Sequence, residues 1–192
     1  AINIDQNNPQ TYAGRAWSYW CWNQCRSKCK RADSLQDFAT ALDLHLDKKS
    51  VIDFLEGPIN EISNIFLPGE EDYGNFPKDF PISKRLLELY NDIILKYSDL
   101  PDGYLHRGIY FMSIHDYENA IADFSAYLRY NNNDIFVIFL QCVCYDRFSD
   151  RAQATENFRL IVLQKGALQC IKKIKEELEK YPPINNEIDL NV

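Results

Sequence analysis

The sequence lacks the short motifs on which most enzymes depend. It contains no glycine-rich phosphate loop, no serine elbow of the GxSxG type and no HExxH zinc motif. Only His45, His106 and His115 are available as acid–base groups near neutral pH, and none stands in a recognisable motif. We therefore predict that the protein is not an enzyme and uses no cofactor.

Long apolar runs and a basic face are missing as well. No apolar stretch approaches the roughly 20 residues that a membrane-spanning helix needs. The net charge is −7, and residues 1–50 contain seven Lys and Arg against five Asp, so the whole of the acidic excess follows residue 50. Because nucleic-acid binding requires a basic face, we expect neither nucleic-acid contact nor a membrane span. The one basic cluster, Arg26 to Arg31, is either a solvated hairpin tip or a contact for an anionic partner.

A targeting segment is not recognisable at the start of the chain. Residues Ala1 to Asn8 show neither a basic nor an apolar targeting pattern, and the chain does not begin with Met. We expect an intracellular, cytoplasmic protein, with an organellar location as the alternative if a transit peptide has been removed.

The cysteines do not form an established metal-binding pattern. Cys21, Cys25 and Cys29 recur every four residues, so on a helix they lie along one drifting face. Three thiolates can share a soft metal ion with a fourth donor, but no CxxC or His-rich segment lies nearby. We interpret them as structural thiols and predict no metal site, with a disulfide or a metal site as the alternatives.

The chain does contain an internal repeat with a period of 34 residues. A helix-turn-helix unit cannot bury its own apolar face, so units that repeat at this period normally stack on one another. We therefore predict an all-α fold, a helix-turn-helix repeat solenoid. The first set of matching positions comprises Tyr104, Gly108, Phe111, Ala120, Phe124 and Tyr127, and the second comprises Ile138, Cys142, Tyr145, Ala154, Phe158 and Ile161.

The segment from Tyr104 to Leu128 resembles a tetratricopeptide repeat. In that family, a large, a small and an aromatic residue lie on the first of two paired helices. A small, an aromatic and a small or medium residue lie on the second. The resemblance implies that Gly108 and Ala120 lie where the helices approach most closely. It also implies that Phe111 and Phe124 fill the space on either side of that contact. Asp116 is expected to cap the second helix. The family's usual function, protein binding, becomes the leading hypothesis.

The pattern divides the chain into segments. We predict one repeat domain over residues 1–181 and a flexible tail over 182–192. The predicted segments are a stretched repeat (9–47), an irregular helical pair (51–98), clear repeats (101–134 and 135–166) and a helix (167–181) that caps the array.

Two of these segments depart from the regular pattern. The stretched repeat has six extra residues around 23–31, which longer helices would absorb. The irregular pair combines a Val51–Leu67 substitute helix with a half-repeat that contains Leu86, Tyr90 and Ile93, and a long loop at Pro68–Pro81 separates them.

The resemblance also implies a concave groove lined by the first helix of each repeat. The groove residues would be Ala13, Trp17, Trp20, Leu105, Ile109, Met112, Phe136, Phe139 and Val143. These are apolar, so the cationic clamp that some family members use for acidic peptides is not expected. The implied ligand is an apolar or helical segment of another protein. The alternative is that the chain's own 51–67 segment or its long loop fills the groove.

These observations predict a protein–protein interaction module, an adaptor or scaffold subunit of a larger complex. A chaperone that shields a client segment is the first alternative. A metal or redox protein that uses Cys21, Cys25 and Cys29 is the second.

Overall fold

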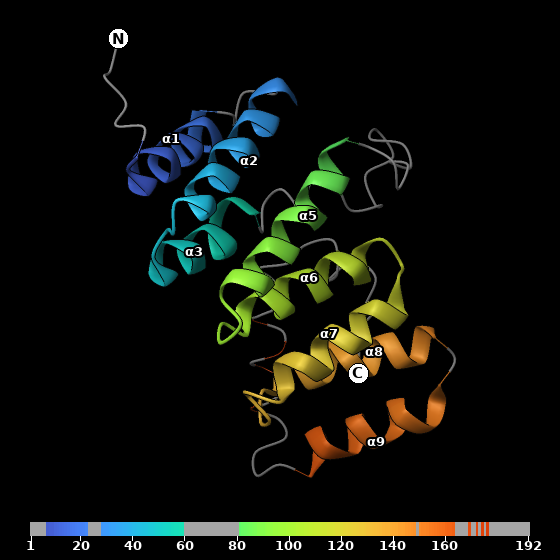
Figure 1. The fold of residues 1–192 in the computed structure, drawn as a ribbon. Coiled ribbons are helices and arrows are strands. Elements are labelled where there is room, and N and C mark those ends of the chain that lie inside the picture. Colours follow the sequence, from blue (N-terminus) through green and yellow to red (C-terminus); the bar gives the residue numbers. More distant parts are fainter. Residues whose placement is uncertain are drawn as a thin grey trace. The chain divides into compact units, whose positions relative to one another are not determined.

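The fold is entirely helical in the part of the chain that a computed structural model describes (Figure 1). The described residues are 7–22, 28–59, 81–148 and 150–163, with the further helical positions 169, 172, 174 and 176; side chains are described for all of these except 20–22, 28–32, 58–59 and 81–83. No strand occurs among them, which confirms the all-α class. None of the described helices has both the length and the apolarity to cross a membrane. Stacking into a solenoid stays a prediction.

The chain divides into two compact units. Of the described residues, 7–59 and 81–103 belong to the first unit, and those from 104 onward belong to the second. The predicted loop at Pro68–Pro81 and the predicted tail at 182–192 lie outside the described residues, except for Pro81 itself, which begins a helix.

The first unit begins with a helical hairpin. Its elements are α1 (Pro9–Trp22), α2 (Lys28–Asp43), α3 (Lys48–Phe54), the single-turn π-helix η1 (Leu55–Ile59) and α5 (Pro81–Lys96). Helix α1 packs along α2, and α2 packs against α5. Helices α1 and α2 contain 14 and 16 residues. This hairpin therefore has the long helices expected of the stretched repeat, although its turn, 23–27, is not among the described residues.

Aromatic side chains fill the core of the first unit. The Phe38 ring of α2 stacks face to face on the Phe54 ring of α3, with centroids 3.7 Å apart and planes 7° apart. On α5, the half-repeat residues Leu86, Tyr90 and Ile93 are completely buried, as the 34-residue period predicts. Apolar burial of this kind is the main force that holds the unit together.

The second unit contains two more hairpins. Its helices are α6 (Asp102–Ser113, whose first two residues belong to the first unit), α7 (Tyr117–Leu128), α8 (Ile135–Arg147) and α9 (Arg151–Val162). Asp116, Asp134 and Asp150 cap the last three, each accepting a hydrogen bond from a backbone N–H of the first turn. The predicted cap at Asp116 is thus confirmed.

Helix α8 is the centre of the second unit. It packs against α7 and α9, and all residues from Phe136 to Gln141 are buried. Ile174, from the helical positions that follow α9, joins the same core, whereas Lys172 and Glu176 are exposed. This alternation fits the apolar stripe predicted for the capping helix, most of which lies outside the described residues.

Candidate functional site

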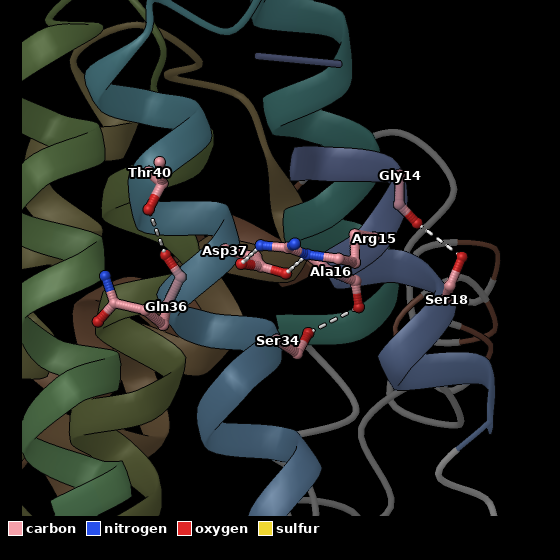
Figure 2. Close-up of polar contacts among 8 residues, drawn as sticks. All are labelled: Gly14, Arg15, Ala16, Ser18, Ser34, Gln36, Asp37 and Thr40. Atoms are coloured by element: carbon pink, nitrogen blue, oxygen red, sulfur yellow. Dashed lines mark hydrogen bonds and ion pairs between the residues drawn. The ribbon is translucent and has the colours of Figure 1, made fainter. Parts of the chain in front are cut away.

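Two hairpins hold the same partly buried ion pair between their helices. In the first, the Arg15 guanidinium of α1 donates from Nε and Nη2 to the two carboxylate oxygens of Asp37 on α2, both at 2.5 Å (Figure 2). In the second, Arg107 of α6 donates in the same way to Asp123 of α7, at 2.8 and 2.7 Å. Each arginine also lies over the tyrosine three residues earlier.

The third hairpin has a neutral pair at the corresponding place. Asn157 Nδ2 of α9 donates to Gln141 Oε1 of α8 at 3.0 Å, and both residues are largely buried. In all three hairpins, one partner directly precedes the small residue of the first helix, and the other directly precedes the phenylalanine of the second. The internal repeat therefore extends to a polar contact that the apolar pattern did not predict.

In both ion pairs, the arginine and the aspartate bind each other and so link the two helices of their hairpin. Burial raises the pKa of the Asp123 carboxyl, and the Arg107 guanidinium acts against that rise. Asp37 raises the pKa of Arg15 mainly through its hydrogen bond. Because each carboxylate already accepts a bidentate arginine, neither is available as a general base.

The small residue of each hairpin lies against the other helix of its pair. A Cβ on Gly108 would lie 2.7 Å from Phe124 Cε1, which confirms the close approach predicted there. In the first hairpin, Ser34 Oγ donates to the Ala16 carbonyl at 2.8 Å (Figure 2). In the third, Cys142 Sγ donates to the Ala154 carbonyl at 3.1 Å.

The three histidines have structural positions. His45 and His115 each follow a helix with φ near +60°, and the next backbone N–H reaches back to a carbonyl of the last turn, as in a Schellman cap. His106 is buried within α6, and burial lowers its pKa to about 4. At neutral pH this imidazole is therefore uncharged.

The predicted groove residues divide between core and surface. In the second unit, Ile109, Met112, Phe136 and Phe139 are buried in the hydrophobic core, and Leu105 and Val143 pack against it. A partner could reach the four buried side chains only if the core rearranged.

In the first unit, the predicted groove residues are more accessible. Ala13 is half-buried, Trp17 is exposed, and the side chain of Trp20 is not among those described. The nine-residue groove as a whole stays a prediction.

Trp17 is the most accessible of the described groove residues, and its ring packs against two neighbours. The indole is 41% exposed. Among the described residues, its ring lies edge-on to the Phe54 ring, at 6.4 Å between centroids, and beside Gly57 in η1. A Cβ at Gly57 would come within 2.8 Å of Trp17 Cη2, so only glycine leaves room for the ring. We call Ala13, Trp17, Phe54 and Gly57 the Trp17 site.

A second apolar surface lies on α9, where the sequence did not suggest one. Phe158 is 53% exposed, although the phenylalanines at the same repeat position, Phe38 and Phe124, are completely buried. Val162, one turn further along, is 48% exposed, and Leu163 is exposed beside it. The repeat pattern predicts an apolar residue at 158 but does not show whether a neighbouring helix covers it.

The search for a metal site covers only the described residues. Among the described residues, no group of three or more His, Cys, Asp or Glu side chains is placed to hold a metal ion. The side chains of Cys21, Cys25 and Cys29 lie outside those residues, so their role stays open to experiment. Cys144 is buried and Cys142 is half-buried.

No family model, curated protein or solved structure matches this chain.

Proposed function

We propose that this chain is a protein-binding adaptor or scaffold subunit built from tetratricopeptide-like hairpins, and that Trp17 contacts an apolar or helical segment of its partner. The observation that carries the proposal is a tryptophan that is 41% exposed while one side of its ring packs against Phe54 and Gly57. Tryptophan is enriched among the residues that dominate interface energies, because its large ring buries much apolar surface on binding.

The shared polar contacts support the repeat interpretation on which the proposal draws. Three hairpins place a hydrogen-bonded pair at the same position relative to their small and aromatic residues. Repeated hairpins of this kind commonly present an extended surface to a partner protein rather than a catalytic pocket.

Purification of the tagged full chain from its source cells, under reducing conditions and at physiological salt, tests the proposal. Wild type is expected to recover a stoichiometric companion, identified by mass spectrometry. Trp17→Ala should reduce that recovery at least about tenfold, because it removes the exposed ring. Phe148→Ala, which truncates a similarly exposed aromatic in the second unit, is the matched control and should retain the companion.

A second variant perturbs the Trp17 site and keeps the tryptophan. Gly57→Ala adds one methyl group against the indole and should displace the ring, and so weaken capture in the same direction as Trp17→Ala. Circular dichroism of each variant verifies that the helices remain. Full retention of the companion by folded Trp17→Ala would refute the proposed role of this residue. A companion captured only after cross-linking would favour the chaperone alternative.

A further inference from the structure

The Trp17 site lies between two stretches of helix that point in the same direction. Near the start of α1, Gln10 Nε2 donates to Ser50 Oγ of α3 at 3.2 Å. One step further, the Trp17 ring lies beside Gly57. The step from 10 to 17 on α1 equals the step from 50 to 57 on α3 and η1, so the two elements run side by side. The site is therefore a strip of surface shared by two elements of the first unit.

An exposed carboxylate lies on this strip. Asp53 follows Ser50 by three residues and precedes Gly57 by four, a spacing that places all three on one side of a helix. The Asp53 side chain is exposed, and within the described part of the chain it forms no hydrogen bond or ion pair. Its polar neighbours differ in this respect, because Ser50 accepts from Gln10. The strip thus combines an exposed indole with a carboxylate that lacks a cation.

The cations near this strip do not compensate Asp53. Arg15 of α1 donates to both carboxylate oxygens of Asp37. Lys49 is exposed one turn before Asp53, but no ion pair joins the two. It also lies further from the indole, because the contacts of Trp17 with α3 and η1 follow Asp53 in the sequence. A ligand that covers Trp17 therefore meets apolar surface beside a negative charge.

We infer that the Trp17 site binds a basic amphipathic helix of the partner protein, with an arginine side chain on the exposed part of the Trp17 indole and its guanidinium at Asp53. The inference rests on the proposed function and adds the chemistry of the partner segment. An indole attracts a cation through its quadrupole, and a carboxylate pairs with the same guanidinium in a bidentate geometry. One arginine therefore satisfies both features of the strip.

The charge of the chain favours the same class of partner. Its net charge is −7, which speeds encounter with a basic segment and slows encounter with an acidic one. An acidic segment would also place like charges together at Asp53, and a purely apolar segment would cover the carboxylate without pairing it. Both would pay an energetic cost that a basic segment avoids.

Two synthetic helical peptides test this inference. Both carry a leucine stripe, with alanine and glutamine at the other positions, and they differ at one central position beside the stripe, which is arginine in one and glutamate in the other. Fluorescence anisotropy of the labelled peptides measures their binding to the full chain at physiological salt. Wild type is expected to bind the arginine peptide at least about tenfold more tightly than the glutamate peptide.

Charge reversal at Asp53 locates the contact. Asp53→Lys should reverse the preference, so that the glutamate peptide binds more tightly than the arginine peptide. Glu118→Lys is the matched control, because it makes the same change in net charge at an exposed position of the second unit and should keep the preference for arginine. Trp17→Ala should weaken the binding of both peptides. Circular dichroism verifies that each variant keeps its helices.

Three results would overturn the inference. The first is equal binding of the two peptides to wild type, and the second is a preference that Asp53→Lys leaves unchanged. The third is binding of neither peptide up to about 1 mM, the weak limit of useful affinities.

Capture of the companion separates this inference from the proposed function. If Trp17→Ala loses the companion and Asp53→Lys retains it fully, Trp17 is a contact residue but recognition of a cation at Asp53 is refuted. If both folded variants retain the companion, the proposed role of Trp17 fails as well. Loss of the companion with each variant, but not with Glu118→Lys, is the result that both proposals expect.

Discussion

A single glycine sets the distance between α6 and α7. Substitution of an exposed helical glycine by alanine normally stabilises a protein by up to about 1 kcal/mol. At Gly108, however, the new Cβ would lie 2.7 Å from the buried Phe124 ring and 3.3 Å from Asp123 Cβ. Overpacking of this kind costs about 1 to 3 kcal/mol, so the steric cost is expected to exceed the gain in helix propensity.

We therefore expect Gly108→Ala to lower the free energy of unfolding by about 1 kcal/mol, measured by urea denaturation. Gly14 on α1 provides the control, because nothing lies within 4 Å of a Cβ built there. Gly14→Ala should stabilise the protein by a similar amount. Equal stabilisation by both substitutions would contradict the close approach at Gly108.

His106 makes stability depend on pH. Its pKa falls from an ordinary 6.5 to about 4 in the folded protein, because burial disfavours the charged imidazolium. Between these values the unfolded chain binds a proton that the folded chain does not, so stability is lost as the pH falls from about 6.5 to about 4. At about 1.36 kcal/mol per unit, the loss amounts to about 3 kcal/mol.

Denaturation of wild type and of His106→Leu at several pH values isolates this contribution. Carboxylates titrate in the same window, but they titrate in both proteins, so the difference between the two stability profiles reports His106. The stability of wild type relative to the variant should decline from pH 6.5 to pH 4 and be level outside that window. A constant difference across the whole range would show that His106 stays hydrated in the folded protein.

At the scale of the helix pair, equivalent positions in different hairpins hold either a charged pair or a neutral hydrogen-bonded pair. Arg107 with Asp123 is the charged one, and Gln141 with Asn157 is the neutral one. Removing one member of a buried ion pair leaves the other without compensation, whereas replacing both is often neutral. The Asp123 side chain is more buried than that of Arg107, so loss of the arginine should be the more damaging change.

A double-mutant cycle tests this comparison. We expect Arg107→Gln to cost about 3 kcal/mol and Asp123→Asn about 2 kcal/mol, while the double variant, which copies the third hairpin, should lie within about 1 kcal/mol of wild type. Urea denaturation of the four proteins gives the coupling energy. If the two single costs simply add in the double variant, the pair does not act as one contact.

The sequence predicts the features of individual helices better than the contacts between helices. The Asp116 cap and the buried Phe38 and Phe124 follow from residue type and period, because capping and apolar periodicity are local properties. The arginine–aspartate pairs were missed, although Asp37 and Asp123 each directly precede the phenylalanine of their repeats. Charged residues beside a packing position normally face water. That these two aspartates are instead buried becomes visible only when the paired helices are seen together.

The candidate site could be predicted only in part. Trp17 was named as a contact residue, and it is exposed. Ile109 and Phe136 were assigned to the groove surface through the family resemblance, yet they lie in the core. The exposure of Phe158 could not be predicted, because it depends on which helix packs against α9 rather than on α9 itself.

At the scale of the whole molecule, each of the two compact units has its own buried core. Phe38, Phe54 and Leu86 are buried in the first, and the cluster that includes Leu140 fills the second. A chain with two cores need not unfold in one step. The tryptophans allow this to be measured, because all of them stand in α1, so their fluorescence reports on the first unit alone.

We expect Leu140→Ala to destabilise the second unit by about 2 to 5 kcal/mol, since it leaves a cavity in a completely buried part of α8. In urea, far-UV circular dichroism should then show an early phase as the second unit unfolds, while the tryptophan transition should move much less. Leu86→Ala, the equivalent core truncation in the first unit, should instead shift the tryptophan transition strongly. If Leu140→Ala moved both signals by the same amount, the two units would unfold as one cooperative body, and interactions between them would have to exceed the cost of the cavity.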